Sequence, residues 1–200
     1  MKVINMAAEP ACAKEHATRP ALTEDVVPGE NGTLQNVVVY LKGDFSRYAF
    51  TAPATPVTID QKGCQYHPHV LVLMTDQTFQ VINSDPVAHN IHPIPKDNRE
   101  WNQSQPPGAA PINQDWAHPE VAIPVKCNIH PWMKMYIGVF GNPYFELTGK
   151  DGSFDIRNVP PGTYTVTAWH KLYGTTEQSV TIQPKESKNI TFTFKATAAS

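Results

Sequence analysis

Prolines recur along the whole chain and divide it into short apolar runs, and this feature limits the possible folds most strongly. The sequence has 19 prolines among its 200 residues, and only 17% of the residues are charged. Because proline breaks the interior of a helix, this composition argues against a long-helix or coiled-coil protein. Runs that alternate apolar and polar residues, such as 163–169 and 179–182, are typical of strands with one buried face. We therefore expect an all-β protein built from two β-sandwiches.

Turn residues and shifts in composition divide the chain into segments. We expect a poorly periodic N-terminal segment over residues 1–33, a first sandwich over 56–141 and a second, smaller one over 142–200. Residues 34–55 hold an apolar strand and a proline-rich linker, and this strand could complete the second sandwich. A Pro/Trp-rich insertion over 93–119 lacks periodicity, so it is either a lid or docking wall, or a surface loop stiffened by proline.

The charge balance gives no support for two classes of partner. The formal net charge is -2 and the isoelectric point is about 6.4. The chain therefore has no electrostatic reason to bind nucleic acid or an anionic membrane. No apolar run approaches the roughly 18 residues that span a bilayer, so we expect no membrane span. The first residues, MKVINMAAEPACAKEH, lack the sustained apolar region of a signal peptide.

A cluster of soft metal ligands lies in residues 127–133. Cys127 and His130 are three residues apart between two strand-like runs, a spacing that lets one tight turn offer sulfur and nitrogen to the same ion. Met133 can approach as a weak axial ligand, and His89 arrives from another strand. A thiolate, two imidazoles and a thioether suit copper. Zinc, the main competitor, rarely takes a thioether.

The chain has three cysteines, and their number bears on the cellular location. An odd number in an exported protein usually means one disulfide and one thiol with its own role. Because its neighbours assign Cys127 to the metal site, we expect Cys12 and Cys64 to pair and to pin the N-terminal segment. The alternative is three unrelated buried thiols. A disulfide would agree with a periplasmic or extracellular protein.

Other histidines compete with this site or add to it. His92 lies three residues after His89, so in an extended strand it faces the opposite way, and we expect a loop or surface histidine. His67 and His69 are two residues apart and would share one face of a strand, where they could converge on a second metal. The alternative is that both histidines pack or hydrogen-bond locally beside an oxidised Cys64.

The ligand segments resemble those of the cupredoxins, a family of blue-copper β-sandwich proteins. The Cys-x-x-His-x-x-Met run at 127–133 is most similar to that of amicyanin, and the His-Asn-Ile-His run at 89–92 resembles the first-ligand segment of amicyanin and plastocyanin. This resemblance covers residues 56–141 and implies a Greek-key sandwich. Residues 151–170 resemble a carboxypeptidase regulatory-like module, a transthyretin-type sandwich. The combination is similar to a group of exported bacterial plastocyanin-like proteins.

The resemblance to cupredoxins implies a role for each ligand of one type-1-like copper ion. His89, Cys127 and His130 would form the trigonal plane. Met133 would take the axial position. Met135 is the rival axial ligand, because its distance along the chain from His130 is plastocyanin-like.

Three functions fit these observations. The first is a periplasmic single-electron carrier without catalytic residues. The resemblance implies that its electrons leave through His130, beside an apolar patch of Pro131 and Trp132 for a redox partner protein. The second is an extracytoplasmic adhesion, scaffold or self-assembling protein in which the copper is structural or vestigial, since such C-terminal sandwiches are frequent spacers. The third is a copper enzyme such as a reductase, which would need a second metal or an open coordination position.

Overall fold

The computed structural model describes residues 1–195, and the chain divides into two units that are described separately. Their residues are 1–24 with 51–141, and 25–50 with 142–200. No helix among the described residues is long and apolar enough to cross a membrane.

Residues 25–33, which the sequence assigns to the N-terminal segment, belong to the second unit. Pro28 and Leu34 form an isolated antiparallel bridge, and the hydroxyl of Thr148 donates a hydrogen bond of 2.8 Å to the carbonyl of Leu34. These contacts attach residues 25–33 to the second unit. Residues 25–33 show no periodicity, so the sequence does not predict this attachment.

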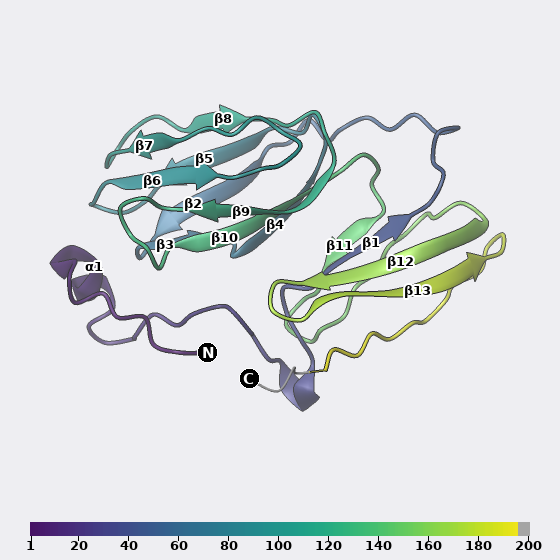
Figure 1. The fold of residues 1–200 in the computed structure, drawn as a ribbon, viewed down its shortest axis with the longest axis horizontal. Helices are drawn as coiled ribbons and strands as arrows, with labels where there is room; N and C mark the ends of the chain where they lie inside the picture. Colours follow the sequence, from purple (N-terminus) through teal and green to yellow (C-terminus); the bar gives the residue numbers. More distant parts are fainter. Residues whose placement is uncertain (196–200) are drawn as a thin grey trace. The chain divides into compact units, whose positions relative to one another are not determined.

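The first unit is a β-sandwich of two sheets (Figure 1). One sheet has the strand order β4-β10-β9-β6-β7 and the other has the order β3-β2-β5-β8. Strand β10 runs parallel to β4 and β2 runs parallel to β5, whereas the other neighbouring pairs are antiparallel. The elements of this unit are α1 (Pro10–Glu15), β2 (Val57–Lys62), β3 (Gln65–His67), β4 (Val70–Met74), β5 (Phe79–Asn83), β6 (His89–Pro93), β7 (Gln103–Gln105), β8 (Ile112–Gln114), β9 (Glu120–Lys126) and β10 (Lys134–Phe140).

The register of β6 on β9 decides where the candidate ligands meet. His92 lies opposite Lys126 in this antiparallel pair. Because the strands are antiparallel and Lys126 is the last residue of β9, the β6 residues that precede His92 lie opposite residues that follow β9. His89 therefore lies beside the turn that joins β9 to β10. The inward residues Ile91 and Ile137 of β6 and β10 have no exposed surface, so both strands are fixed by the core beneath the turn.

The insertion over 93–119 is part of the sandwich and not only a surface loop. Its strand β7 pairs with β6 and its strand β8 pairs with β5, so it extends both sheets. Trp116 is buried, and its ring centroid lies 4.9 Å from that of Phe79 in the core. Strands of three residues that are rich in Gln, Asn and Ser have no alternating apolar pattern, which explains why the sequence does not predict them.

The second unit contains one four-stranded antiparallel sheet with the order β11-β1-β12-β13. Strand β1 is far from the other three in sequence, and Figure 1 shows it in blue between the green β11 and β12. The elements of this unit are a short 3₁₀ helix (Glu30–Gly32), β1 (Val38–Lys42), β11 (Phe145–Leu147), β12 (Gly162–His170) and β13 (Gly174–Ile182).

Two further segments of the second unit alternate apolar and polar residues, and the sequence predicts them as strands. Neither 153–156 nor 188–194 belongs to a strand in the described part of the chain. Their apolar side chains still pack on the core, and the rings of Phe154 and Phe192 lie 6.3 Å apart. The alternation therefore reflects the burial of one face and not the pairing of strands.

Candidate metal centre

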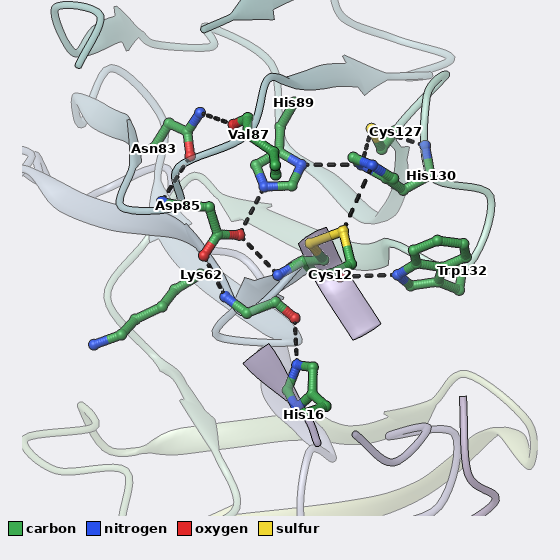
Figure 2. The surroundings of a disulfide bond; sticks show 12 residues. Cys12, His16, Lys62, Asn83, Asp85, Val87, His89, Cys127, His130 and Trp132 are labelled. Atoms are coloured by element: carbon green, nitrogen blue, oxygen red, sulfur yellow. Dashed lines mark hydrogen bonds and ion pairs between the residues drawn. A yellow bond between two sulfur atoms is a disulfide. The ribbon is translucent and has the colours of Figure 1, made fainter. Parts of the chain in front are cut away.

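Three donor atoms from two separate stretches of the chain converge in the first unit (Figure 2). The Nδ1 atoms of His89 and His130 are 3.0 Å apart, and Sγ of Cys127 lies 3.8 Å from Nδ1 of His130. All three donor atoms lie within 4.8 Å of one another. The exposed fractions are only 0% for His89, 3% for Cys127 and 2% for His130. The structure thus brings these three predicted ligands together in a water-poor site.

A tight turn between β9 and β10 presents two of the ligands. The backbone N–H of Cys127 donates to the carbonyl of Met133 at 3.1 Å, and the N–H of Met133 donates to the carbonyl of His130 at 3.0 Å. The N–H of His130 also points at the sulfur of Cys127, at 3.3 Å. Because the antiparallel strands fix both ends of the turn, the sulfur and the imidazole keep their relative position.

A carboxylate fixes the orientation of His89. Oδ2 of Asp85 lies 2.7 Å from Nε2 of His89 and accepts a hydrogen bond from it. The same carboxylate accepts hydrogen bonds from the backbone N–H groups of Gly63, at 2.6 Å, and Cys64, at 2.7 Å. A neutral His89 that donates from Nε2 has its lone pair on Nδ1, facing the other donor atoms. Asp85 therefore selects the tautomer that can bind a metal.

The environment favours the metal-binding protonation state of Cys127 and of His130, but the protonated state of His89. Burial would raise the pKa of the Cys127 thiol, but hydrogen bonds from His89 and from backbone N–H groups outweigh burial and lower this pKa. Burial and the neighbouring His89 both lower the pKa of His130. Burial would also lower the pKa of His89, yet the hydrogen bonds and charges of Asp85 and Cys127 together outweigh it and raise this pKa, so a metal ion would displace a proton from His89. A thiolate and neutral imidazoles are the forms that bind metals.

The donor set and its spacing fit a copper ion. Metal bonds of about 2.0 Å to nitrogen and about 2.3 Å to sulfur, at trigonal angles, would place the donor atoms about 3.5 to 3.7 Å apart. The distances of 3.0 Å and 3.8 Å are close to these values. Two imidazole lone pairs at 3.0 Å repel each other unless a cation or a proton lies between them. One thiolate and two imidazoles in a trigonal arrangement are typical of blue-copper sites.

The two candidate axial methionines are both buried but occupy different places in the fold. Met133 ends the ligand turn and is hydrogen-bonded through its backbone to both Cys127 and His130. Met135 is the second residue of β10 and shares the inward face of that strand with Ile137, in the core of the sandwich. The axial role of Met133, with Met135 as its rival, stays a prediction.

A hydrogen-bond network ties β6 to the ligand turn. The side chain of Asn90, next to His89, accepts a hydrogen bond of 3.1 Å from the N–H of Asn128 and donates one of 2.5 Å to Asn102. The hydroxyl of Tyr66 donates to the carbonyl of Asn90 at 2.5 Å, and burial raises the pKa of Tyr66. Tyr66 therefore stays a protonated donor, and the network holds the two ligand-bearing segments together.

A disulfide covers the edge of His130 that points away from the other donors. Cys12 and Cys64 are bonded, with sulfur atoms 2.02 Å apart, and Sγ of Cys12 lies 3.7 Å from Nε2 of His130. The ring of Trp132 lies 5.2 Å from that of His130, and its N–H donates to the carbonyl of Cys64 at 3.0 Å (Figure 2). Pro131 is exposed and Trp132 is half-buried. His130, which the predicted partner patch of these two residues would expose to a redox partner, is itself buried.

The other candidate histidines lie outside this donor group. His67 is exposed at the end of β3, whereas His69 is buried before β4, with Nδ1 4.0 Å from a carboxylate oxygen of Glu24. These two histidines therefore do not share one face of a strand, which the second-metal prediction requires. His92 is half-buried in β6 and not in a loop, and it pairs with Glu100 at 2.7 Å.

Two contributors to the site are not among the residues predicted from the sequence. Asp85 has a weak signal, since it stands four residues before His89 and a carboxylate often orients a metal-binding histidine. The contact of the disulfide with His130 has no signal in the sequence, because Cys12 and His130 are 118 residues apart.

Comparison with protein families finds one match in this chain. Residues 143–195 match the family model of the carboxypeptidase regulatory-like domain. The match covers much of the second unit and begins just before β11. No curated protein matches the chain.

Several solved structures are similar to this chain, and among them are copper proteins. A Cu-containing nitrite reductase from Thermus scotoductus has 21% identity and a TM-score of 0.40, over 46% of this chain and 24% of its own length. A purple cupredoxin from Nitrosopumilus maritimus has 20% identity and a TM-score of 0.36, over 42% of this chain and 98% of its own. Amicyanin from Paracoccus versutus has 16% identity and a TM-score of 0.35, over 44% and 83%.

This chain thus spans about a quarter of the length of the nitrite reductase that it resembles. The likeness to these structures concerns the fold alone. The family match agrees with the second module that the sequence predicts. Residues 143–195 of this chain are thus similar to a carboxypeptidase regulatory-like domain.

Proposed function

We propose that this protein holds one type-1-like copper ion and carries single electrons. Its ligands would be His89, Cys127 and His130 in the plane, with Met133 in the axial position. The observation that carries the proposal is the convergence of one buried thiol and two imidazole Nδ1 atoms within 4.8 Å. Copper bound there would supply a one-electron couple between Cu(II) and Cu(I).

The chain itself would keep the site in one geometry during electron exchange. The turn between β9 and β10 holds Cys127 and His130, and Asp85 holds His89 through its Nε2–H. Burial of all three donor side chains excludes water. A ligand set that does not move between oxidation states needs little reorganisation, which suits an electron carrier better than a catalyst.

We place this carrier outside the cytoplasm, in the periplasm or the extracellular space, and assign it a redox partner protein. The disulfide between Cys12 and Cys64 supports this location, since such bonds persist in oxidising compartments. The proposal assigns no catalytic residue. The second group of ligand atoms in residues 1–195 is Cys64, Asp85 and His89, and Cys64 lacks a thiolate because it is disulfide-bonded.

Absorption spectroscopy and voltammetry of the copper-loaded protein test the proposal. We expect an intense visible charge-transfer band that Cys127→Ser abolishes, and a reversible one-electron wave in the unmodified protein. His92→Gln is the matched control for Cys127→Ser, because His92 lies near the turn but outside the donor group. A band that persists in Cys127→Ser would contradict the assignment of the thiolate.

One observation favours the second candidate, a scaffold or adhesion protein with structural copper. His130 exposes only 2% of its surface, so no ligand edge is open to a partner. Under that alternative the copper site would stabilise the sandwich but exchange electrons slowly. Self-association that is independent of copper, with no reversible wave, would support the scaffold over the carrier.

A further inference from the structure

The Nε2 edge of His130 meets a sulfur atom instead of water or a carboxylate. Sγ of Cys12 is 3.7 Å away, and sulfur is a weak hydrogen-bond acceptor. His89, in contrast, has the carboxylate of Asp85 at 2.7 Å from its Nε2. The two histidines are therefore held differently: one by a strong hydrogen bond within the sandwich, the other by the packing of a disulfide.

The cover over His130 combines the disulfide with noncovalent contacts of residues 1–24. Cys12 is the buried residue of the six-residue helix α1, Ala13 packs partly on the core, and Met6 and Ala21, on either side of the helix, are buried in it. Beside it, a ring nitrogen of His16 lies 2.7 Å from the carbonyl of Gly63. On the other side, Trp132 donates to the carbonyl of Cys64. Figure 2 shows the disulfide beside α1 and close to the rings of His130 and Trp132.

We propose that the Cys12–Cys64 disulfide is a thiol–disulfide exchange site that controls access to His130. One thiol of a dithiol reductant would attack a sulfur of this bond and form a mixed disulfide with the protein. The second thiol of the reductant would then attack the mixed disulfide and release the protein. The protein would gain two electrons and two protons as two thiols, and the reductant would become a disulfide. Both sulfurs are almost fully buried, so the exchange would start from a state in which α1 has moved away.

Reduction would open His130 while leaving His89 in place. Without the sulfur–sulfur bond, α1 loses its covalent tether to the turn between β2 and β3, and the edge of His130 becomes accessible. Asp85 is held by backbone N–H groups of Gly63 and Cys64, which do not depend on that bond. The oxidised protein would keep the ligand edge closed, and the reduced protein would expose it to a redox partner or to a copper donor.

Histidine modification of the metal-free full chain tests this directly. Diethylpyrocarbonate labelling at one fixed pH, read by peptide mass spectrometry, compares protein before and after treatment with a dithiol. We expect the labelling rate of His130 to rise about tenfold or more on reduction, with His89 still protected. The double variant Cys12→Ala/Cys64→Ala should behave as the reduced form without any reductant.

Two matched controls complete the experiment. His16→Ala removes a contact of the N-terminal segment but keeps the disulfide, so His130 should stay protected. Exposed His67 should label at the same rate in every sample. Continued protection of His130 in both the reduced protein and the double variant would overturn the proposal. Equal labelling of His89 and His130 would also overturn it, because reduction would then open the whole sandwich and not only uncover His130.

The functional meaning of this cover rests on the proposed copper site, but the labelling does not. If the metal-free protein opens on reduction yet binds no copper, the proposed function fails and the exchange site stands. If copper binds but reduction leaves His130 closed, the exchange site fails and the proposed function stands. A copper(I) chelator should also remove copper about tenfold faster from the reduced holoprotein.

Discussion

Replacing Asp85 by asparagine probes the central contact of the candidate site with a change of one functional group. The carboxylate accepts three hydrogen bonds, from His89 Nε2 and from the N–H groups of Gly63 and Cys64, at 2.6 to 2.7 Å. Asparagine keeps one acceptor oxygen and places an NH₂ group where the second oxygen was. If the NH₂ group replaces Oδ1, the N–H of Gly63 loses its acceptor. If it replaces Oδ2, the N–H of Cys64 loses its acceptor and His89 changes tautomer.

Either outcome weakens copper binding. An NH₂ group that donates to Nε2 of His89 moves the imidazole proton to Nδ1, which then points at the thiol and the second imidazole and cannot bind a metal. Loss of the carboxylate behind a metal-binding histidine typically lowers metal affinity about 10- to 100-fold, or roughly 1.4 to 2.7 kcal/mol. A buried donor without a partner costs a further 1 to 3 kcal/mol, approximately, in the free energy of unfolding.

Competition with a chelator of known affinity measures the first effect, and urea unfolding of the metal-free protein measures the second. Glu100→Gln is the matched control, because Glu100 pairs with His92 at the same 2.7 Å but is 56% exposed. We expect that control to leave copper affinity within about twofold. Copper affinity of Asp85→Asn equal to that of the unmodified protein would refute the role of Asp85 in orienting His89.

Three further predictions concern stability. Reducing the Cys12–Cys64 bond, which closes a loop of 52 residues, should lower the free energy of unfolding by about 4 kcal/mol in guanidinium unfolding, and a loss below about 1 kcal/mol would contradict this. Burial, followed by the charge of Lys171, lowers the pKa of His170 to about 4, so the unfolded chain takes up this proton first as the pH falls. Stability should therefore drop between pH 6.5 and about 4, by up to about 3 kcal/mol, and His170→Gln should remove that part of the pH dependence; an unchanged pH profile would argue against a buried neutral imidazole. Trp116→Ala should cost about 3 to 5 kcal/mol in urea unfolding, because its ring fills the core beside Phe79, whereas a loss below about 1 kcal/mol would place the insertion outside the core.

The sequence predicts best those features that depend on neighbours along the chain. Cys127, His130 and Met133 lie within one turn between two strands, so their spacing alone indicates that they can face the same ion. The family match at 143–195 rests likewise on a continuous segment with alternating strands and turns. The all-β class follows from the same short-range patterns of proline, glycine and alternating residues.

Features that depend on distant contacts are beyond the sequence. The three-residue strands β7 and β8 exist because neighbouring strands offer them backbone partners, not because of their own residues. Segment 188–194 has the alternation of a strand but packs on the core without a strand ladder. The closure of His130 needs the position of α1, which follows from a disulfide and from packing over 118 residues of sequence separation.

X-ray absorption spectroscopy of the copper-loaded protein measures the coordination shell itself. The proposed site predicts a first shell of one thiolate sulfur and two imidazole nitrogens, with the sulfur contribution lost in Cys127→Ser. A first shell made only of nitrogen and oxygen atoms in the unmodified protein would contradict the account.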